Sequence, residues 1–539
     1  MRTFRFSLLA LFVAFLAACS GPEEPSLTAP SQTLPPTVPL PDVPGSLPFS
    51  DPVASGDVEP LTLRVSIPRM TFVAPHVVDE TDPVEVLVTD LLTDGLTERD
   101  PYTGEVGPGL AQLWSVSEDR LTWTFLLGAR EFSTGEPITA DDVVASLNRV
   151  AGLGVQSLSG VNLAVVEGYA AVAAGEATVM TGVVAPDDAT VVITLTEPYE
   201  PLAELLAGVT FGVFPVDIDT TGPLPLSSSR SFVPTAMWDE GFRVTADGLD
   251  GTISAIEVWA DPDASLIADG EVDLAIGLTA DDVPNGFNSS WAQRSADAFF
   301  ALNHDVAPFD DPVVRRALLR AIDQTELRDE FFPEAGIMQG FVPQDVPGGS
   351  PDACGDYCET ILRRARGAIR DTGAGDVPFT VDFFVDDIDD SEQRLAEAIV
   401  ATLRNVGLNA TARAHSIEDY GARIAAGDMA MFRFGSVSTA LIADADLADM
   451  FHTNGPDNVT NTSIPEFDAL VEEARLTVDA DERAALYAEA ENLLFKEAVV
   501  VPLVEFRQRI VLGERIESAG LEPDGSLDLG SVVFLGPEE

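Results

Sequence analysis

The chain has 539 residues, 46% of them hydrophobic, and its 89 acidic and 30 basic residues give a formal net charge of −59. This length exceeds what one hydrophobic core supports and suits two lobes of about 200–250 residues each. The charge excludes nucleic-acid binding, because a surface that binds phosphates has to be basic.

The N-terminus has the pattern of a lipoprotein signal peptide. Arg2 and Arg5 are basic, residues 6–16 are almost wholly apolar, and a Leu-Ala-Ala-Cys sequence ends at Cys19. Small residues suit the signal peptidase, and two or three acyl chains on the cysteine hold a protein durably on a bilayer. We predict that residues 1–18 are removed and that Cys19 anchors the chain on the extracytoplasmic (periplasmic or outer) face of the cell membrane. The alternative is an ordinary secretory signal with an incidental cysteine.

The segment after the signal peptide is rich in Pro, Ser, Thr and Gly as far as residue 60. It offers too little aromatic or aliphatic material to build a core, and proline-rich segments of this kind tend to be extended. Residues 19–60 are therefore predicted to be a lipidated cysteine followed by a disordered tether. The folded part is expected to begin near Leu61.

Strand and helix patterns alternate along the rest of the chain, which predicts an α/β fold. Alternating or β-branched runs predict strands at 61–67, 121–125, 190–195 and 254–260. Apolar residues at helical spacing predict helices at 83–96, 312–323, 358–371, 391–406, 466–476 and 480–497. Two capping boxes, Thr139 to Asp142 and Ser463 to Glu466, predict helix starts.

Two cysteines remain for the folded part, Cys354 and Cys358 in the sequence CGDYC. A local disulfide is the simple interpretation for an exported chain. On one helix their Cα atoms would lie about 6 Å apart, near the upper end of the disulfide range, so a loop or a helix start fits better. Redox exchange and metal binding are the alternatives, and metal binding would need further ligands.

The acidic residues are spread along the whole chain. We interpret this excess as an adaptation to a saline habitat, where an acidic surface stays hydrated while salt screens its charges. The alternative is an acidic cleft that attracts cationic solutes.

The residues needed for catalysis are missing. His76, His304, His415 and His452 lack the spacing of a zinc site. Neither a Gly-x-Ser-x-Gly nucleophile turn nor a Gly-x-x-x-x-Gly-Lys phosphate loop occurs. We predict that the chain is not an enzyme and that it holds no cofactor and no metal.

Seven segments, in the same order along the chain, resemble the family 5 extracellular solute-binding proteins, the dipeptide-, oligopeptide- and nickel-binding receptors of ABC importers. The segments are 85–150, 166–177, 182–198, 269–277, 300–323, LAEAIVATLRNVGLNA and 465–503. The resemblance implies a two-lobed periplasmic-binding-protein-like fold with a hinge crossed twice and a ligand cleft between the lobes.

The crossings are expected near Phe299–Asn303 and Val499–Glu505. Lobe one would then comprise residues 61–298 plus 503–539, and lobe two residues 299–502.

Peptide-binding members of the family carry a tryptophan and then an aspartate that pairs with the amino group of the peptide. Aligning Gly435 with the glycine of the family places Ser436 at the tryptophan and Thr439 at the aspartate. The resemblance therefore implies that this anchor for the amine is missing. Asp444 or Asp446 would replace it if the loop has another register.

Arg433, Ser436, Ser438 and Thr439 remain as candidate ligand-binding residues, and they suit a neutral polar or anionic ligand. An ion pair between Arg433 and one of the many acids is the alternative. Trp291 either stacks on a ligand or covers the core.

The resemblance implies a monomeric receptor that captures a small-molecule ligand, a peptide or similar polar solute. It delivers this ligand to an ABC permease, whose ATPase is a separate subunit, and contacts the membrane through its lipid anchor. The alternatives are a surface sensor or peptide-holding protein of the same fold, and a secreted hydrolase.

Overall fold

The structure is a computed structural model. It describes residues 61–67, 83–100, 105–154, 157, 160–218, 228–230, 232–238, 241–246, 253–260, 263–344, 346–350, 352–385, 390–437, 441–519 and 527–535. The predicted signal peptide, Cys19 and the tether lie outside these residues, as do Ser438 and Thr439.

The largest sheet has eleven strands in the order β15-β14-β16-β12-β17-β11-β1-β10-β9-β8, with β13 paired to β17. Its strands are β1 (Leu61–Ile67), β8 (Phe232–Trp238), β9 (Gly241–Ala246), β10 (Ile253–Ala260), β11 (Leu274–Ile276), β12 (Asn288–Leu302), β13 (Gly336–Ile337), β14 (Pro378–Phe384), β15 (Asn409–His415), β16 (Met431–Val437) and β17 (Val500–Leu512).

Three smaller sheets complete the β structure. A four-stranded antiparallel sheet has the order β4-β5-β7-β6, and two two-stranded sheets pair β2 with β3 and β18 with β19. Their bounds are β2 (Thr97–Arg99), β3 (Val106–Pro108), β4 (Ala111–Val116), β5 (Thr122–Leu127), β6 (Val183–Asp187), β7 (Thr190–Thr194), β18 (Ile516–Ser518) and β19 (Val533–Phe534).

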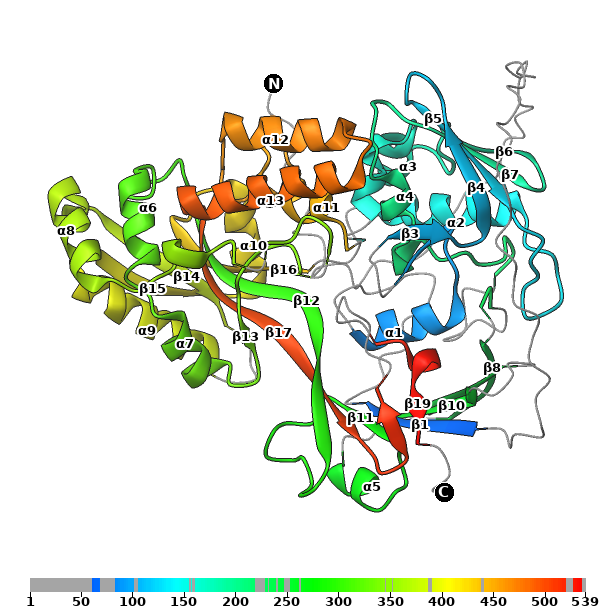
Figure 1. The fold of residues 1–539 in the computed structure, drawn as a ribbon. Helices are drawn as coiled ribbons and strands as arrows, with labels where there is room; N and C mark the ends of the chain where they lie inside the picture. The colour runs from blue at the N-terminus through cyan, green and yellow to red at the C-terminus, as the bar shows by residue number, and fades with distance from the viewer. Residues whose placement is uncertain are drawn as a thin grey trace.

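The two longest strands, β12 and β17, lie antiparallel along most of their length. They run together from the part of the molecule that holds α6 to α13 down to the part that holds β1, β10 and β11 (Figure 1). Their register shifts between Gln293 and Asp297 and again between Ala298 and Phe299. Such irregularities increase local twist and re-aim side chains.

Helices cover both faces of β12, β14 and β16. One core contains Phe300 beneath α6 (Pro312–Leu319), α7 (Gln324–Phe331), α8 (Leu362–Thr372) and α9 (Ser391–Asn405). The core on the opposite face contains Phe299 beneath α10 (Ile417–Ala426), α11 (Ala443–Phe451), α12 (Pro465–Leu476) and α13 (Ala480–Glu497). Adjacent phenylalanines serve opposite cores because strand side chains alternate.

Two further cores belong to the other half of the molecule. The four-stranded sheet packs on α2 (Ala140–Leu153), α3 (Tyr169–Ala173) and α4 (Leu202–Leu205). The strands β1, β8, β9 and β10 pack on α1 (Pro83–Leu92), while α5 (Ala264–Ala268) lies beside β11. Within the described residues, no helix combines the length and the apolar character that a membrane span requires.

The structure confirms β1 and the helices over 391–405 and 480–497, and it corrects several ends. The helix predicted at 83–96 ends at Leu92, and the one predicted at 358–371 begins at Leu362 after a short 3₁₀ turn. Apolar spacing alone does not resolve these ends, because Leu96 and Ile361 continue the helical pattern beyond the helices themselves.

The first predicted capping box is confirmed, because the Asp142 carboxylate accepts a hydrogen bond of 2.8 Å from the Thr139 amide. The second prediction was wrong, since α12 begins at Pro465 and its N-cap residue is Ile464. A proline suits the first turn of a helix, where its missing N–H costs nothing. The Ser463 hydroxyl instead lies 3.2 Å from the Thr453 hydroxyl.

Candidate ligand-binding site

Of the predicted ligand-binding residues that the structure describes, only Ser436 lies where β12 meets β16 and β17. Asp297 of β12 is opposite Ser436 of β16 on one side and opposite Glu505 of β17 on the other. A Cβ atom at Gly435 would lie only 2.6 Å from the carbonyl oxygen of Asp297. Glycine is therefore needed here, because it lets the two strands approach.

Asp297 is an acid that the sequence did not single out. Its side chain is only partly exposed, and its carboxylate forms no hydrogen bond or ion pair with any described residue. Burial raises the pKa of Asp297 well above its usual value, and the nearby carboxylates of Glu505, Asp446 and Glu491 raise it further. The Asp297 carboxylate is thus partly exposed, lies among other acids, and has lost much of its water to the surrounding protein.

The other carboxylates near Asp297 include two with clear structural partners. Glu491 of α13 accepts hydrogen bonds from the amides of Phe341, Val342 and Ser350 at 2.6, 2.9 and 2.9 Å. Glu505 accepts one from the Nε of Arg507 at 3.0 Å. The negative charge of Asp297 has no such compensation.

Arg433 lies on the other face of the sheet. It is opposite Phe300, whose side chain belongs to the core under α9. The guanidinium Nε is 3.5 Å from a carboxylate oxygen of Glu392, and the side chain is 10% exposed. Burial lowers the pKa of Arg433. The structure thus gives Arg433 an acidic partner, which is the alternative that the sequence left open.

Trp291 does not join this group of residues. It lies six positions before Asp297 on β12, which corresponds to about 20 Å of strand. The guanidinium of Arg509 lies 4.2 Å from the centre of its ring, and Arg509 also pairs with Glu334 at 2.8 Å. One face of the indole is therefore covered by a neighbouring side chain.

Asp444 is committed to a buried network between the two halves of the molecule. Arg475 of α12 donates two hydrogen bonds to its carboxylate, at 2.8 and 3.0 Å. The hydroxyls of Tyr199 and Tyr487 donate two more, at 3.1 and 2.9 Å. The side chain is 1% exposed, so Asp444 cannot serve as the replacement for the missing anchor.

The same interface has further contacts. Arg483 of α13 forms an ion pair with Glu204 of α4, and Arg99 of β2 donates a 2.9 Å hydrogen bond to the carbonyl of Leu441. Ile442 packs into the core of the four-stranded sheet. The segment around residues 199–204 is therefore fastened to α11, α12 and α13.

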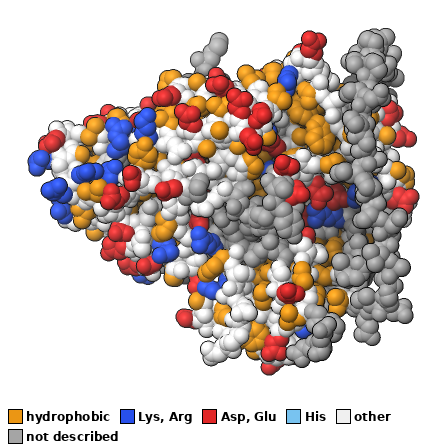
Figure 2. Space-filling model, in the orientation of Figure 1, with side chains coloured by type: hydrophobic (Ala, Val, Ile, Leu, Met, Phe, Trp, Pro, Cys, Tyr) orange, Lys and Arg blue, Asp and Glu red, His pale blue; other side chains and the backbone are white. Residues whose placement is uncertain are grey.

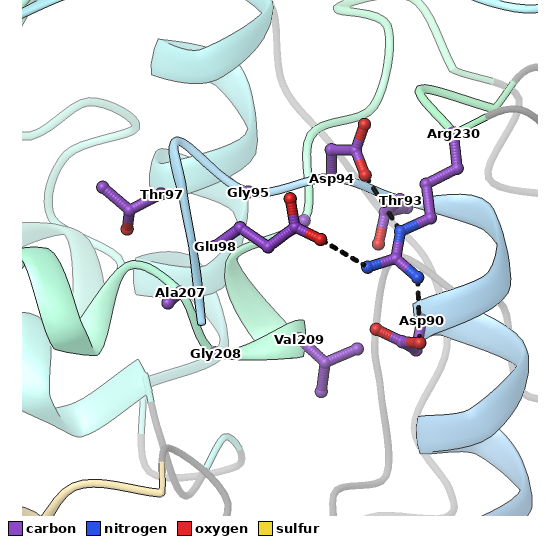
Figure 3. Close-up of a pocket in the computed structure, with 11 residues that line it drawn as sticks. Asp90, Thr93, Asp94, Gly95, Thr97, Glu98, Ala207, Gly208, Val209 and Arg230 are labelled. Atoms are coloured by element: carbon purple, nitrogen blue, oxygen red, sulfur yellow. Dashed lines mark hydrogen bonds and ion pairs between the residues drawn. The ribbon is translucent and has the colours of Figure 1, made fainter. Parts of the chain in front are cut away.

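A small pocket lies beneath the end of α1, where Arg230 is surrounded by carboxylates (Figure 3). Arg230 contacts Asp94 at 2.9 Å, Asp90 at 3.0 Å and Glu98 at 3.7 Å. Burial raises the pKa of Asp90 to about 6. The pocket holds about 290 Å³ including its open mouth. Because three acids share the guanidinium, this arrangement fastens the loop around Arg230 to α1, to the turn after it and to β2.

Cys354 and Cys358 are paired in a disulfide with their Cα atoms 5.5 Å apart. They flank a 3₁₀ turn, Gly355–Tyr357, just before α8. Within the described part of the chain, no group of three or more His, Cys, Asp or Glu side chains is placed to hold a metal ion.

The comparisons with known proteins agree with this architecture. The model of the bacterial extracellular solute-binding proteins, family 5 (middle), matches residues 105–232 and 252–458. The chain is 24% identical over 475 residues to the dipeptide-binding protein DppE of Bacillus subtilis, covering 81% of this chain and 86% of that protein. It is 26% identical over 465 residues to the dipeptide-binding protein of Escherichia coli, covering 76% and 82%.

Solved structures show the same fold. HbpA2 from Haemophilus parasuis matches with a TM-score of 0.74 at 23% identity, covering 88% of this chain and all of that one. The unliganded open form of the murein tripeptide binding protein MppA matches with a TM-score of 0.73 at 19% identity, covering 88% and 98%. The chain belongs to the family 5 bacterial extracellular solute-binding proteins.

Proposed function

We propose that this chain is the extracytoplasmic receptor of an ABC importer. It captures a peptide or similar small polar solute and delivers it to a membrane permease. The observation that carries the proposal is the long pairing of β12 with β17, with Asp297 of β12 lying between Ser436 of β16 and Glu505 of β17. Relatives named as dipeptide-, deoxycholate- and heme-binding proteins support a receptor for small molecules.

The proposed lobes are those expected from the sequence, 61–298 with 503–539 and 299–502. Two adjacent strands that cross between lobes form a hinge, because small backbone changes in both rotate one lobe against the other. A solute between the lobes would stabilise the closed arrangement by its differential affinity for that state. The solute would contact Asp297 and Ser436, which lie opposite each other on β12 and β16.

The ligand is proposed to present a positively charged group to Asp297. A cation there would offset the repulsion among Asp297, Glu505 and Asp446, and it would restore the ionised form of the carboxylate. Asp297 would thus replace the aspartate that is absent at Thr439. A peptide amino group satisfies this requirement, and so does any small solute with an ammonium or guanidinium group.

The finer features of the proposal concern the cell surface. Cys19 would carry the acyl chains, residues 19–60 would form the tether, and the chain would act as a monomer on the extracytoplasmic face. The permease and its ATPase would be separate proteins. No enzymatic step is part of the proposal.

The first test is mass spectrometry of the small molecules released when the purified full chain is denatured. The variant Cys19→Ala removes the acylation site and leaves the rest of the sequence intact. Recovery of a peptide or other small polar solute is expected, and returning it to the emptied protein should reduce the radius of gyration measured by small-angle scattering. A chain that converts the solute into a product would refute the receptor function. A chain that holds only unfolded polypeptide would instead be a peptide-holding protein of the same fold.

A further inference from the structure

Helix α8 presents four arginines to solvent. Arg363, Arg364, Arg366 and Arg370 are all exposed, while Ala365 and Ile369 of the same helix are buried in the core. We call these four side chains the arginine face.

This composition is unusual for the chain. Acids outnumber basic residues by 89 to 30 overall, yet α8 has four arginines in eleven residues and a single acid, Asp371. Basic side chains gather at the left end of the molecule in the space-filling view, at the place that α8 occupies in the ribbon (Figures 1 and 2). The face is thus a positive patch on an acidic molecule.

The arginine face is poorly neutralised by the protein. The side chains of Arg363 and Arg364 form no hydrogen bond or ion pair with any described residue, and neither does Glu359 just before the helix. Arg366 donates to the carbonyl and side-chain oxygens of Asn405, at 3.1 and 2.8 Å, which carry no charge. Of the four arginines, only Arg370 has an acidic partner among the described residues, Asp371.

The position of these charges disfavours the helix itself. Arg363 and Arg364 lie in the first turn, which has no acidic residue, and the N-cap residue Ile361 offers no side-chain cap. The N-terminus of a helix carries a partial positive charge that favours acids and disfavours cations. Helix stability therefore does not account for the two arginines, which leaves a role outside the fold.

Helix α8 is held firmly in place. The Ile361 amide donates a 2.8 Å hydrogen bond to the carbonyl of Arg320, and the Thr360 hydroxyl donates one of 3.2 Å to the carbonyl of Ile322. The disulfide closes the turn just before the helix. Nη1 of Arg320 is buried and has no hydrogen-bond partner in the described chain, which adds positive charge near the start of α8.

We propose that the arginine face docks on the anionic phospholipid headgroups of the membrane. Guanidinium groups match phosphate oxygens in paired hydrogen bonds. A basic patch is also the kind of second signal that strengthens binding by a lipid anchor. The net charge of −59 does not prevent this contact, because charges farther away than the Debye length of about 8 Å at physiological salt are screened.

Docking through α8 leaves the hinge accessible. The helix lies at the far end of its half of the molecule from the lower ends of β12 and β17 (Figure 1). Membrane contact there would not cover Asp297. The inference therefore does not depend on the identity of the solute.

The test is co-sedimentation of residues 19–539, which lack the predicted signal peptide and carry Cys19→Ala, with vesicles of phosphatidylcholine, with or without phosphatidylglycerol. Binding is expected only to the vesicles that contain phosphatidylglycerol. It should weaken at about 1 M salt, where the Debye length falls to about 3 Å. Replacing both Arg363 and Arg364 by Gln should lower the partition coefficient about 25-fold, since each arginine near a membrane contributes about fivefold.

The matched control removes two positive charges elsewhere. Arg120→Gln with Arg243→Gln does so at side chains that are each 39% exposed and lie outside α8. Equal binding to both kinds of vesicle would overturn the proposal, as would an equal loss in the control. Binding to polyglutamate without binding to phosphatidylglycerol would also overturn it and assign the face to an acidic protein. Thermal unfolding of each variant confirms that these exposed changes leave the fold intact.

Discussion

At the scale of single residues, two acids have opposite roles. Asp444 is buried and saturated by four hydrogen bonds from Arg475, Tyr199 and Tyr487. Asp297 is partly exposed and lacks a partner among the described residues. A satisfied buried carboxylate contributes to a unique structure, whereas an unsatisfied one opposes folding and is retained where a ligand can neutralise it.

Asp444→Ala should lower the free energy of unfolding by about 3 kcal/mol, because it leaves the partly buried Arg475 guanidinium without its counter-ion. Tyr199→Phe removes one hydrogen bond from the same carboxylate and should cost only about 1 kcal/mol. Urea unfolding followed by circular dichroism measures both. Equal effects of the two substitutions would show that the carboxylate is not the centre of this network.

Asp297→Asn should stabilise the empty protein by on the order of 1 kcal/mol, because it removes a desolvated charge that other acids repel. The same change should reduce affinity for the dipeptide Ala-Phe and leave that for N-acetyl-Ala-Phe unchanged. Calorimetric titration of both probes is the measurement. Asp356→Asn removes the same charge from an exposed position and should change neither quantity. A loss of stability in Asp297→Asn would mean that the carboxylate has a structural partner.

At the scale of elements, the residues in the first turn of a helix either stabilise or destabilise that helix. The start of α2 satisfies its first-turn amides through Asp142, whereas α8 begins with Arg363 and Arg364 at its positive end. Helix α12 begins with Pro465, whose ring fixes the backbone in helical geometry without a side-chain cap.

Arg364→Glu should stabilise α8 by about 0.3–1 kcal/mol, because an acid in the first turn interacts favourably with the helix dipole. The same substitution should lower binding to vesicles that contain phosphatidylglycerol about 25-fold, because it also changes the charge by two units. Arg370→Glu is the matched control, because Arg370 lies in the last turn and its reversal should not stabilise the helix. Urea unfolding compares the two variants, and equal shifts would contradict the dipole explanation.

At the scale of the whole molecule, buried acids link stability to pH. Burial raises the pKa of Glu491 from 4.5 to about 7 and that of Asp457 from 3.8 to about 6. In such a window the folded state binds more protons than the unfolded state, so stability falls as pH rises. The free energy of unfolding should therefore be higher near pH 5 than at neutral pH.

Asp457→Asn should reduce the fall in the free energy of unfolding between about pH 4 and 6. The fall that Glu491 causes at higher pH should remain. Urea unfolding at a series of pH values, at one fixed high salt concentration, measures both slopes while salt screens the general repulsion of the acidic surface. Stability that rises with pH over the whole range would show that these two groups do not dominate the linkage.

The sequence by itself determined the family, the α/β class and most helices, because the colinear motifs and apolar spacing are local properties of the chain. It also predicted the missing anchor at Thr439 from a short alignment around Gly435. The sequence did not show which residues from distant parts of the chain lie next to each other. Only tertiary structure placed Asp297 opposite both Ser436 and Glu505, because sheet order joins strands from different parts of the chain.

Tertiary structure likewise decided which charged side chains are free to contact a ligand. Asp444 and Arg433 look available in the sequence, yet the fold supplies Arg475 for one and Glu392 for the other. The four arginines of α8 can be read from the sequence. Their exposure, and the lack of partners for Arg363 and Arg364 among the described residues, depend on which side of the helix the core covers. The sequence shows which residues are charged. Whether a charged side chain forms an ion pair or stays available for a ligand depends on the residues that folding places beside it.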